Sequence, residues 1–250
     1  MQRFFVPAEL LQDSTVVLPR EVAHHAGSVL RLRQGAEVLL LDGLGEVCRC
    51  RLESLGRSSA TVRVLERWRE AEGAFPIHLL QALPKGEKME LILQKGTELG
   101  LVAFTPLLTG RTIPERSESR GLRQQERWER IVREAARQCR RPRLPRVAPP
   151  VRLAAGLGAC TEELRLILWE DESRPLAEVL GRTSPRSAAI LIGPEGGFAP
   201  EEVEVARGAG FIPVRVGPRI LRTETAGLAM ASILQFLYGD LGTSQPPLTD

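Results

Sequence analysis

The sequence predicts an α/β protein with a parallel sheet, preceded by a smaller β-rich domain. From residue 77 onward, short apolar runs alternate with amphipathic stretches, as strands and helices do in a parallel sheet covered on both faces. The first 70 residues instead contain short alternating runs at roughly ten-residue spacing, which is typical of a small β-barrel. A polar stretch at residues 70–73 predicts the linker, so we expect domains at residues 1–72 and 73–250.

The expected elements follow one another along the chain. In the first domain the strands are residues 36–41, 46–52 and 60–66, separated by turns rich in Gly and Ser. In the second domain the order is strand 77–83, helix 87–99, strand 101–107, helix 122–141, strand 164–169, helix 176–180, strand 188–192, helix 200–209, strand 212–216 and helix 226–238. Residues 144–161 are rich in Pro, Ala and Gly, which predicts a connector.

Composition excludes several classes of protein. The 250 residues are 43% hydrophobic and 26% charged, an ordinary globular composition that argues against wholesale disorder. Every apolar run is far shorter than the ~18 residues of a membrane span, and the first residues lack a secretory signal. The four cysteines form neither a disulfide framework nor a zinc motif. We therefore expect a cytoplasmic protein with no metal and no membrane partner.

Arginine is the unusual component of this sequence. The chain has 31 arginines but only 3 lysines, which are Lys85, Lys88 and Lys95. Codon composition or growth at high temperature is one interpretation, and phosphate recognition by guanidinium groups is the other. Residues 111–146 carry 12 arginines against 5 acidic residues, and six arginines recur there at steps of three or four. Such a stripe predicts either a solvated helix face or a site for a polyanion such as nucleic acid.

Two glycine-containing loops follow the last strands of the expected sheet. Residues 193–198 contain three glycines, but they match neither the dinucleotide fingerprint nor the P-loop, and Glu195 would repel a phosphate. Residues 217–226 are more polar than a simple connection requires. There Thr223 or Thr225 could cap the last helix, whereas Arg222 and Glu224 are candidates for chemistry. Since ligands bind beyond the carboxyl ends of parallel strands, these loops and residues 169–173 predict one shared crevice.

The motifs resemble those of a known family. LIGPEGGF at residues 191–198 and VGPRILRTETA at residues 216–226 resemble the bacterial 16S ribosomal RNA uridine-N3 methyltransferases, the RsmE family of the SPOUT superfamily. The resemblance runs along the whole chain, through RFFV at residues 3–6, QKGTELG at residues 94–100 and the helix motif that contains Glu134 and Arg141. Arg137 stands where the family usually has an acidic residue, and Arg140 and Pro142 replace commoner small or polar residues.

The resemblance implies a specific fold and reaction. It implies a PUA-like N-terminal barrel that binds RNA, and a SPOUT domain whose last segments form a deep trefoil knot that binds S-adenosylmethionine. It also implies a homodimer that methylates N3 of uridine 1498 of 16S rRNA in the assembled small ribosomal subunit. Two other functions stay open: a different SPOUT reaction such as ribose 2′-O-methylation, and a non-catalytic RNA-binding factor of ribosome assembly.

Candidate residues follow for each role. For catalysis we expect Arg222 to face the uracil or a phosphate, with Arg141 as a second candidate, and Glu195, Glu224 or a water to accept the N3 proton. The lysines that persist in an arginine-rich chain suggest specific roles for Lys85 and Lys95. The expected cofactor-binding residues are Leu168, Trp169, Glu170, Leu191, Ile192, Gly193, Pro194, Glu195, Gly196, Gly197, Gly217, Ile220, Leu221 and Thr225. The expected RNA-binding residues are Arg3, Arg31, Arg123, Arg127, Arg130, Arg137 and Arg140.

Overall fold

The chain divides into two compact units. The computed structural model describes residues 1–56, 59–73, 75–112, 118–171, 173–181 and 184–243, without the side chains of residues 118–120. The first unit contains Met1–Glu72 and Ala136–Leu144, and the second contains Gly73–Ala135 and Pro145–Gln245. Arg116 and the side chain of Arg120, which belong to the basic stretch, lie outside this description. None of the described helices is both long and apolar enough to cross a membrane.

The first unit is built on a five-stranded sheet, where the sequence predicted a small barrel. Its order is β1 (Gln2–Phe5), β3 (Glu37–Leu41), β4 (Glu46–Leu55), β5 (Ala60–Arg69) and β2 (Thr15–Val17). The pair β1–β3 is parallel and the other pairs are antiparallel. The short 3-10 helix η1 (Ala8–Gln12), helix α1 (Arg20–His24) and the π-helical turn η2 (His25–Val29) complete the unit. Apolar side chains from the sheet and from these helices form one core, and Leu39, Leu41 and Val47 form a smaller cluster.

The second unit contains an eight-stranded sheet in which every pair is parallel. Along its main path the order is β11 (Arg174–Pro175), β13 (Ile212–Arg215), β10 (Leu164–Leu168), β12 (Ala188–Ile192), β6 (Ile77–Ala82), β7 (Leu101–Leu108) and β8 (Arg146–Val147). The eighth strand, β9 (Val151–Arg152), also pairs with β7. All five residues of β12 are buried, because this central strand is covered on both faces.

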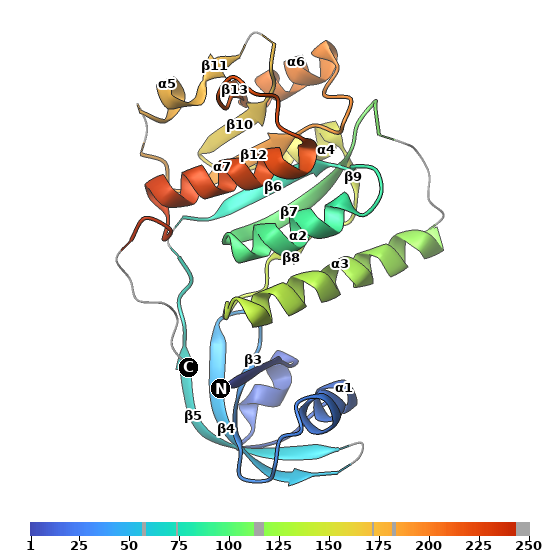
Figure 1. Cartoon of the computed structure of the whole chain (residues 1–250), viewed down its shortest axis with the longest axis vertical. Coiled ribbons are helices and arrows are strands. Elements are labelled where there is room, and N and C mark those ends of the chain that lie inside the picture. Colours follow the sequence, from blue (N-terminus) through green and yellow to red (C-terminus); the bar gives the residue numbers. More distant parts are fainter. Residues whose placement is uncertain (57–58, 74, 113–117, 172, 182–183, 244–250) are drawn as a thin grey trace. The chain divides into compact units, whose positions relative to one another are not determined.

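Helices cover both faces of this sheet (Figure 1). Helix α2 (Lys88–Glu98) and helix α7 (Thr223–Tyr238) pack together on one face, in a core shared with α3 (Glu118–Gln138) and α5 (Leu176–Leu180). On the other face, α4 (Leu153–Gly158) and α6 (Pro200–Gly208) pack against each other and share a second core. This arrangement confirms the α/β prediction and leaves the carboxyl ends of β10, β12 and β13 at one edge.

Three expected helix boundaries are wrong, the first being the start of α3, at Glu118 rather than at residue 122. Helix α3 ends at Gln138 rather than at residue 141, and Arg140 has a left-handed backbone with φ 67° that no α-helix contains. Helix α7 begins at Thr223 rather than at residue 226, with Arg222 as its N-cap residue. Neither Thr223 nor Thr225 is therefore the capping residue that the sequence suggested.

Several short elements escaped the sequence-based prediction. Strands β1 and β2 were not predicted, and the expected connector at residues 144–161 contains β8, β9 and α4. These elements have between two and six residues, so their hydrophobic periodicity cannot be distinguished from that of a loop. The longer elements of the second domain lie within a few residues of their predicted ranges.

Candidate active site

A cavity of about 540 Å³ opens where β10, β12 and β13 end. The segments that follow these three strands line it together, as the predicted crevice requires. Its apolar wall includes Ile192, Phe198, Val214 and Ala226, while its charged groups include Lys88, Glu170, Glu195 and Arg222. The volume lies within the range of small-molecule sites.

A buried hydrogen-bond chain holds the β12 loop against α7. The Thr223 hydroxyl donates to the carbonyl oxygen of Gly193 at 2.6 Å and accepts a bond from Gln81 Nε2 at 2.9 Å. Thr223 is 7% exposed and Gln81 is fully buried. A Cβ at Gly193 would meet the Phe198 ring at 3.2 Å, so a side chain there would press on the loop. These contacts preorganise one wall of the cavity.

Lys88 lines the cavity and joins two carboxylates, Glu195, which also lines it, and Glu224, which does not. Its Nζ lies 2.9 Å from Glu195 Oε1 and 3.3 Å from Glu224 Oε2. Burial works against ionisation of Glu195, but the hydrogen bond from Lys88 and a backbone N–H bond from Lys85 hold the pKa of this carboxyl below its ordinary value. A backbone N–H bond, followed by Lys88, also lowers the pKa of Glu224. The hydrogen bond to Glu195 raises the pKa of Lys88, so all three groups stay charged at neutral pH.

The two arginines proposed for catalysis lie in different units. Arg222 is exposed, lines the cavity and contributes to lowering the pKa of Glu224. Arg141 is buried in the first unit, where its Nε donates to Glu72, and it is not among the residues that line the cavity. The geometry therefore favours Arg222 for contact with a bound substrate.

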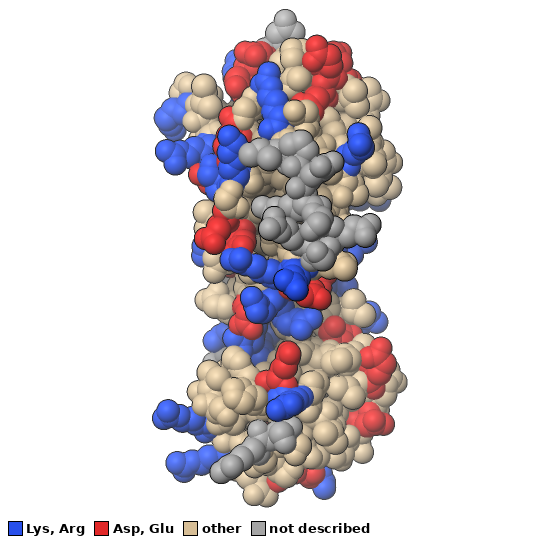
Figure 2. Space-filling view, turned by 90° about the vertical axis from the view of Figure 1, so that its right-hand side faces the viewer, with Lys and Arg blue, Asp and Glu red and all other residues tan. Residues whose placement is uncertain are grey.

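Arginines of the predicted stripe are spread along α3 and beyond its end. Figure 2 shows a group of Lys and Arg side chains on the face that carries α3. On α3, Arg123 and Arg130 are exposed, while Arg127 pairs with Glu90 at 2.8 Å and with Glu87 at 3.6 Å. The stripe is thus partly neutralised by acidic residues at the start of α2.

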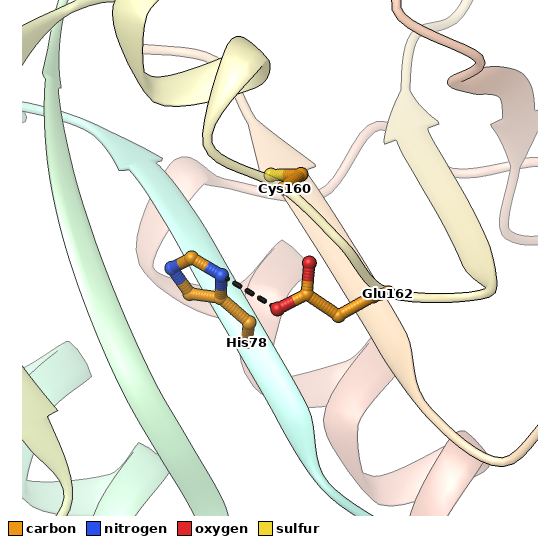
Figure 3. Close-up of side chains that lie close together, drawn as sticks. All are labelled: His78, Cys160 and Glu162. Carbon is orange, nitrogen blue, oxygen red and sulfur yellow. Dashed lines mark hydrogen bonds and ion pairs between the residues drawn. The ribbon is translucent and has the colours of Figure 1, made fainter.

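A second polar cluster lies away from the cavity. His78 Nδ1 is 2.9 Å from Glu162 Oε1, and the Cys160 thiol lies beside this pair (Figure 3). The other ring nitrogen, Nε2, is 2.8 Å from the Thr105 hydroxyl. Burial raises the pKa of Cys160 to about 12, so this side chain is a thiol at neutral pH. We interpret the cluster as a hydrogen-bond network that links β6, β7 and the start of β10.

Comparison with known proteins identifies the family. Residues 71–235 match the RNA methyltransferase domain model and residues 18–65 match the RNA methyltransferase PUA domain model. Ribosomal RNA small subunit methyltransferase E of Synechocystis sp. is 39% identical over 92% of this chain and 76% of its own length. The protein of the same name from Mycobacterium bovis is 34% identical over 89% of this chain and 87% of its own. This chain belongs to the ribosomal RNA small subunit methyltransferase E family.

A solved member of this methyltransferase E family has the same fold. The crystal structure of ribosomal RNA small subunit methyltransferase E from Neisseria gonorrhoeae, bound to S-adenosyl methionine, superposes with a TM-score of 0.87. It is 34% identical and the match covers 96% of this chain and 99% of that one. The matches to both domain models and to this structure confirm the expected family and the PUA-like N-terminal domain.

Most of the residues that we expected to bind the cofactor line this cavity. Leu191, Gly196 and Thr225 are the exceptions: Leu191 is buried within β12, and Gly196 and Thr225 are exposed outside the lining. Lys88 and Phe198 line the cavity but were missed, because no local pattern distinguishes them from surface or core residues. Lys95, for which a specific role was expected, pairs with Glu98 on its own helix.

Proposed function

We propose that this chain transfers a methyl group from S-adenosylmethionine to N3 of a uridine in 16S rRNA, uridine 1498 of the small subunit. The observation that carries the proposal is the preorganised cavity at the ends of β10, β12 and β13. It occurs in a chain whose solved relative from Neisseria gonorrhoeae is described as bound to S-adenosyl methionine. Membership of the methyltransferase E family supports the RNA substrate.

The cavity has the chemistry that this cofactor needs. Ile192, Val214 and Ala226 provide an apolar wall for an adenine ring, while Glu170 and Glu195 can accept hydrogen bonds from ribose hydroxyls or an ammonium group. The absence of a side chain at Gly193 leaves its backbone accessible and avoids a clash with Phe198. The carboxylates also favour a cationic sulfonium over a phosphate-bearing cofactor.

The reaction requires loss of the N3 proton and stabilisation of the resulting anion. When bound, the cofactor supplies an electrophilic methyl group on a sulfonium. Arg222, an exposed residue of the cavity lining, donates to the uracil oxygens and stabilises the negative charge. Lys88 keeps Glu195 and Glu224 ionised, so both carboxylates can accept a hydrogen bond. Because Glu195 lines the cavity and its pKa is lowered, we infer that it orients a water that carries the proton away, while Glu224 acts through Lys88.

We also propose that the segment after β13 and helix α7 form the trefoil knot, and that the enzyme is a homodimer. A cavity of about 830 Å³ beside α7 is lined mostly by apolar residues, among them Leu176, Ile233 and Leu237. It shares Gly217 with the first cavity, and Phe236 and Leu237 are 65% and 51% exposed. A second copy that covered this surface would bury apolar area beside the proposed cofactor site.

Methyl transfer to purified small ribosomal subunits tests the proposal directly. With labelled S-adenosylmethionine we expect N3-methyluridine at one position of 16S rRNA, identified by nucleoside mass spectrometry and mapping. A 2′-O-methylated product would show the alternative SPOUT reaction. Failure to bind S-adenosylmethionine in calorimetry would show a non-catalytic protein. Arg222→Ala should abolish transfer while leaving cofactor affinity nearly unchanged, and normal turnover would contradict its role.

A further inference from the structure

The first unit contains a cationic cavity of its own. Its volume is about 410 Å³, and its lining includes Arg3, His25, Leu30, Arg137 and Arg140. No Asp or Glu is among the described residues that line it. The cavity lies where β1 and η2 meet the residues that follow α3, all of which belong to the first unit.

Arg3 is built into the floor of this cavity. It is 8% exposed, and its Nη1 donates to the backbone carbonyl of Arg140 at 2.8 Å. Burying a guanidinium is costly unless its donors are satisfied, so this bond holds the group in a defined place. The same bond links the start of β1 to the residues after α3. It therefore fixes the orientation of the Arg3 guanidinium group before a ligand binds.

Arg137 is held in a similar way. Its Nη1 lies 2.8 Å from Nε2 of His25, in the π-helical turn η2. Since a guanidinium can only donate, Nε2 accepts this bond and the imidazole carries its proton on Nδ1. The Phe4 and His25 rings pack edge to face, with 6.0 Å between ring centroids. The imidazole thus holds Arg137 at the cavity, and single-turn π-helices often mark functional sites.

Backbone strain is concentrated at the same cavity. Among the described residues, the non-glycine positions with positive φ are Arg31, at 51°, and Arg140, at 67°. A left-handed residue with a Cβ is sterically strained, because the Cβ approaches the following carbonyl oxygen. Arg140 lines the cavity and Arg31 directly follows Leu30, which also lines it. Such strain persists where the surrounding structure imposes it, and it clusters at functional sites.

We propose that this cavity binds a backbone phosphate of the substrate RNA through the guanidinium groups of Arg3, Arg137 and Arg140. The proposal rests on the proposed function in that RNA is the substrate, but the site is separate from the cofactor cavity. Guanidinium groups match the geometry of phosphate oxygens, and bonds between these charged groups are stronger than neutral ones. Phosphate contacts fix register without reading sequence, so this site positions the RNA while the other unit acts on the base.

Imidazole NMR gives a direct test with inorganic phosphate as the probe. The chain has three histidines, His24, His25 and His78, so the ring ¹⁵N signals of the full-length protein are few and can be assigned with single substitutions. Phosphate should shift the His25 signals, because Arg137 changes its partner, while His78 in the second unit stays unchanged. The Arg140→Gly variant should weaken this response. Unchanged His25 signals at saturating phosphate would overturn the proposal.

RNA binding tests whether the phosphate comes from the substrate. In Arg140→Gly the left-handed backbone is retained at no steric cost, and the carbonyl that accepts from Arg3 remains, so the variant should fold normally. Arg51→Gln, at an exposed ion pair in the same unit, removes the same charge and is the control. For a 16S rRNA fragment, Arg140→Gly should weaken binding about tenfold and flatten the slope of log affinity against log salt by about 0.7–0.9.

The outcomes separate this proposal from the proposed function. A response of His25 to phosphate with an unchanged salt slope would show a site for free phosphate and overturn the assignment to RNA. Equal effects of Arg140→Gly and Arg51→Gln would show that only net charge matters, and would also overturn it. Cofactor affinity, measured on the same variants by calorimetry, should not change. If the unmodified protein does not bind the cofactor, the proposed function is contradicted, but the proposal of a phosphate site is not.

Discussion

The hydrogen bonds of Thr223 should couple the stability of the second unit to cofactor affinity. Thr223→Val preserves side-chain shape but removes the donor to Gly193 and the acceptor for Gln81. Both partners are then left without this bond in a buried environment, since Thr223 is 7% exposed and Gln81 fully buried. An unsatisfied buried group costs about 1–3 kcal/mol, so the two together should lower the free energy of unfolding by about 2–4 kcal/mol.

Urea denaturation measures this loss, and calorimetry measures the accompanying fall in affinity for S-adenosylmethionine. Thr225→Val is the matched control, because Thr225 is exposed two residues later and does not line the cavity. It should change stability by less than about 0.5 kcal/mol and leave affinity unchanged. The double variant Gln81→Met with Thr223→Val should recover part of the loss, because both polar partners are then removed together. A loss below about 0.5 kcal/mol in Thr223→Val, with unchanged cofactor affinity, would refute the reasoning.

Three other predictions concern the carboxylates and the apolar surface. Lys88→Met removes the cation that lowers the pKa of Glu195 and Glu224, so the acid limb of the pH–activity profile should move to higher pH. Lys95→Met is the control on the same helix. Superimposable pH–activity profiles for Lys88→Met and the unmodified protein would contradict the proposed role of Lys88. Burial opposes ionisation of Glu162, but the hydrogen bond from His78 lowers its pKa below 4.5 in the folded protein. Its ionised form therefore adds stability above the unfolded pKa, and this stability is lost as pH falls through the folded value. Glu162→Gln should flatten the fall in urea midpoint between about pH 7 and about pH 3, and an unchanged pH dependence would contradict this assignment. Leu237→Glu places a charge on the proposed apolar interface and should give monomers in light scattering. The control Leu122→Glu, at an exposed position on α3, should remain dimeric. A dimeric Leu237→Glu variant would refute the proposed interface.

The parts of the fold that local patterns could predict are those with long or strongly apolar elements. Strand β12 is a continuous apolar run, which matches a central strand buried on both faces. Helix α3 was predicted from the spacing of its arginines, but its end was not, because the left-handed turn at Arg140 is imposed by contacts such as the bond from Arg3. Strand β1 was missed since its four residues gain their pairing from β3, far along the chain.

The candidate site likewise has a part that local sequence patterns predicted and a part that depends on contacts between distant residues. Glycines and polar residues after three strand ends indicated a ligand crevice, because parallel strands end at a common edge whatever the details of packing. Lys88 could not be placed there from sequence, since its contacts with Glu195 and Glu224 join residues more than 100 positions apart. The same holds for His78, which is on β6 and meets Cys160 and Glu162, two residues of the segment before β10, only through the order of strands in the sheet.

The sequence by itself determined the family, the α/β class and the loops that surround the cavity, since these depend on local motifs and on periodicity. Tertiary structure decided which charges meet. It placed Arg141 with Glu72 inside the first unit, Lys88 between two carboxylates, and Arg3, Arg137 and Arg140 around one cavity. Electrostatic interactions depend on distance in space and on burial, and neither can be read from spacing along the chain.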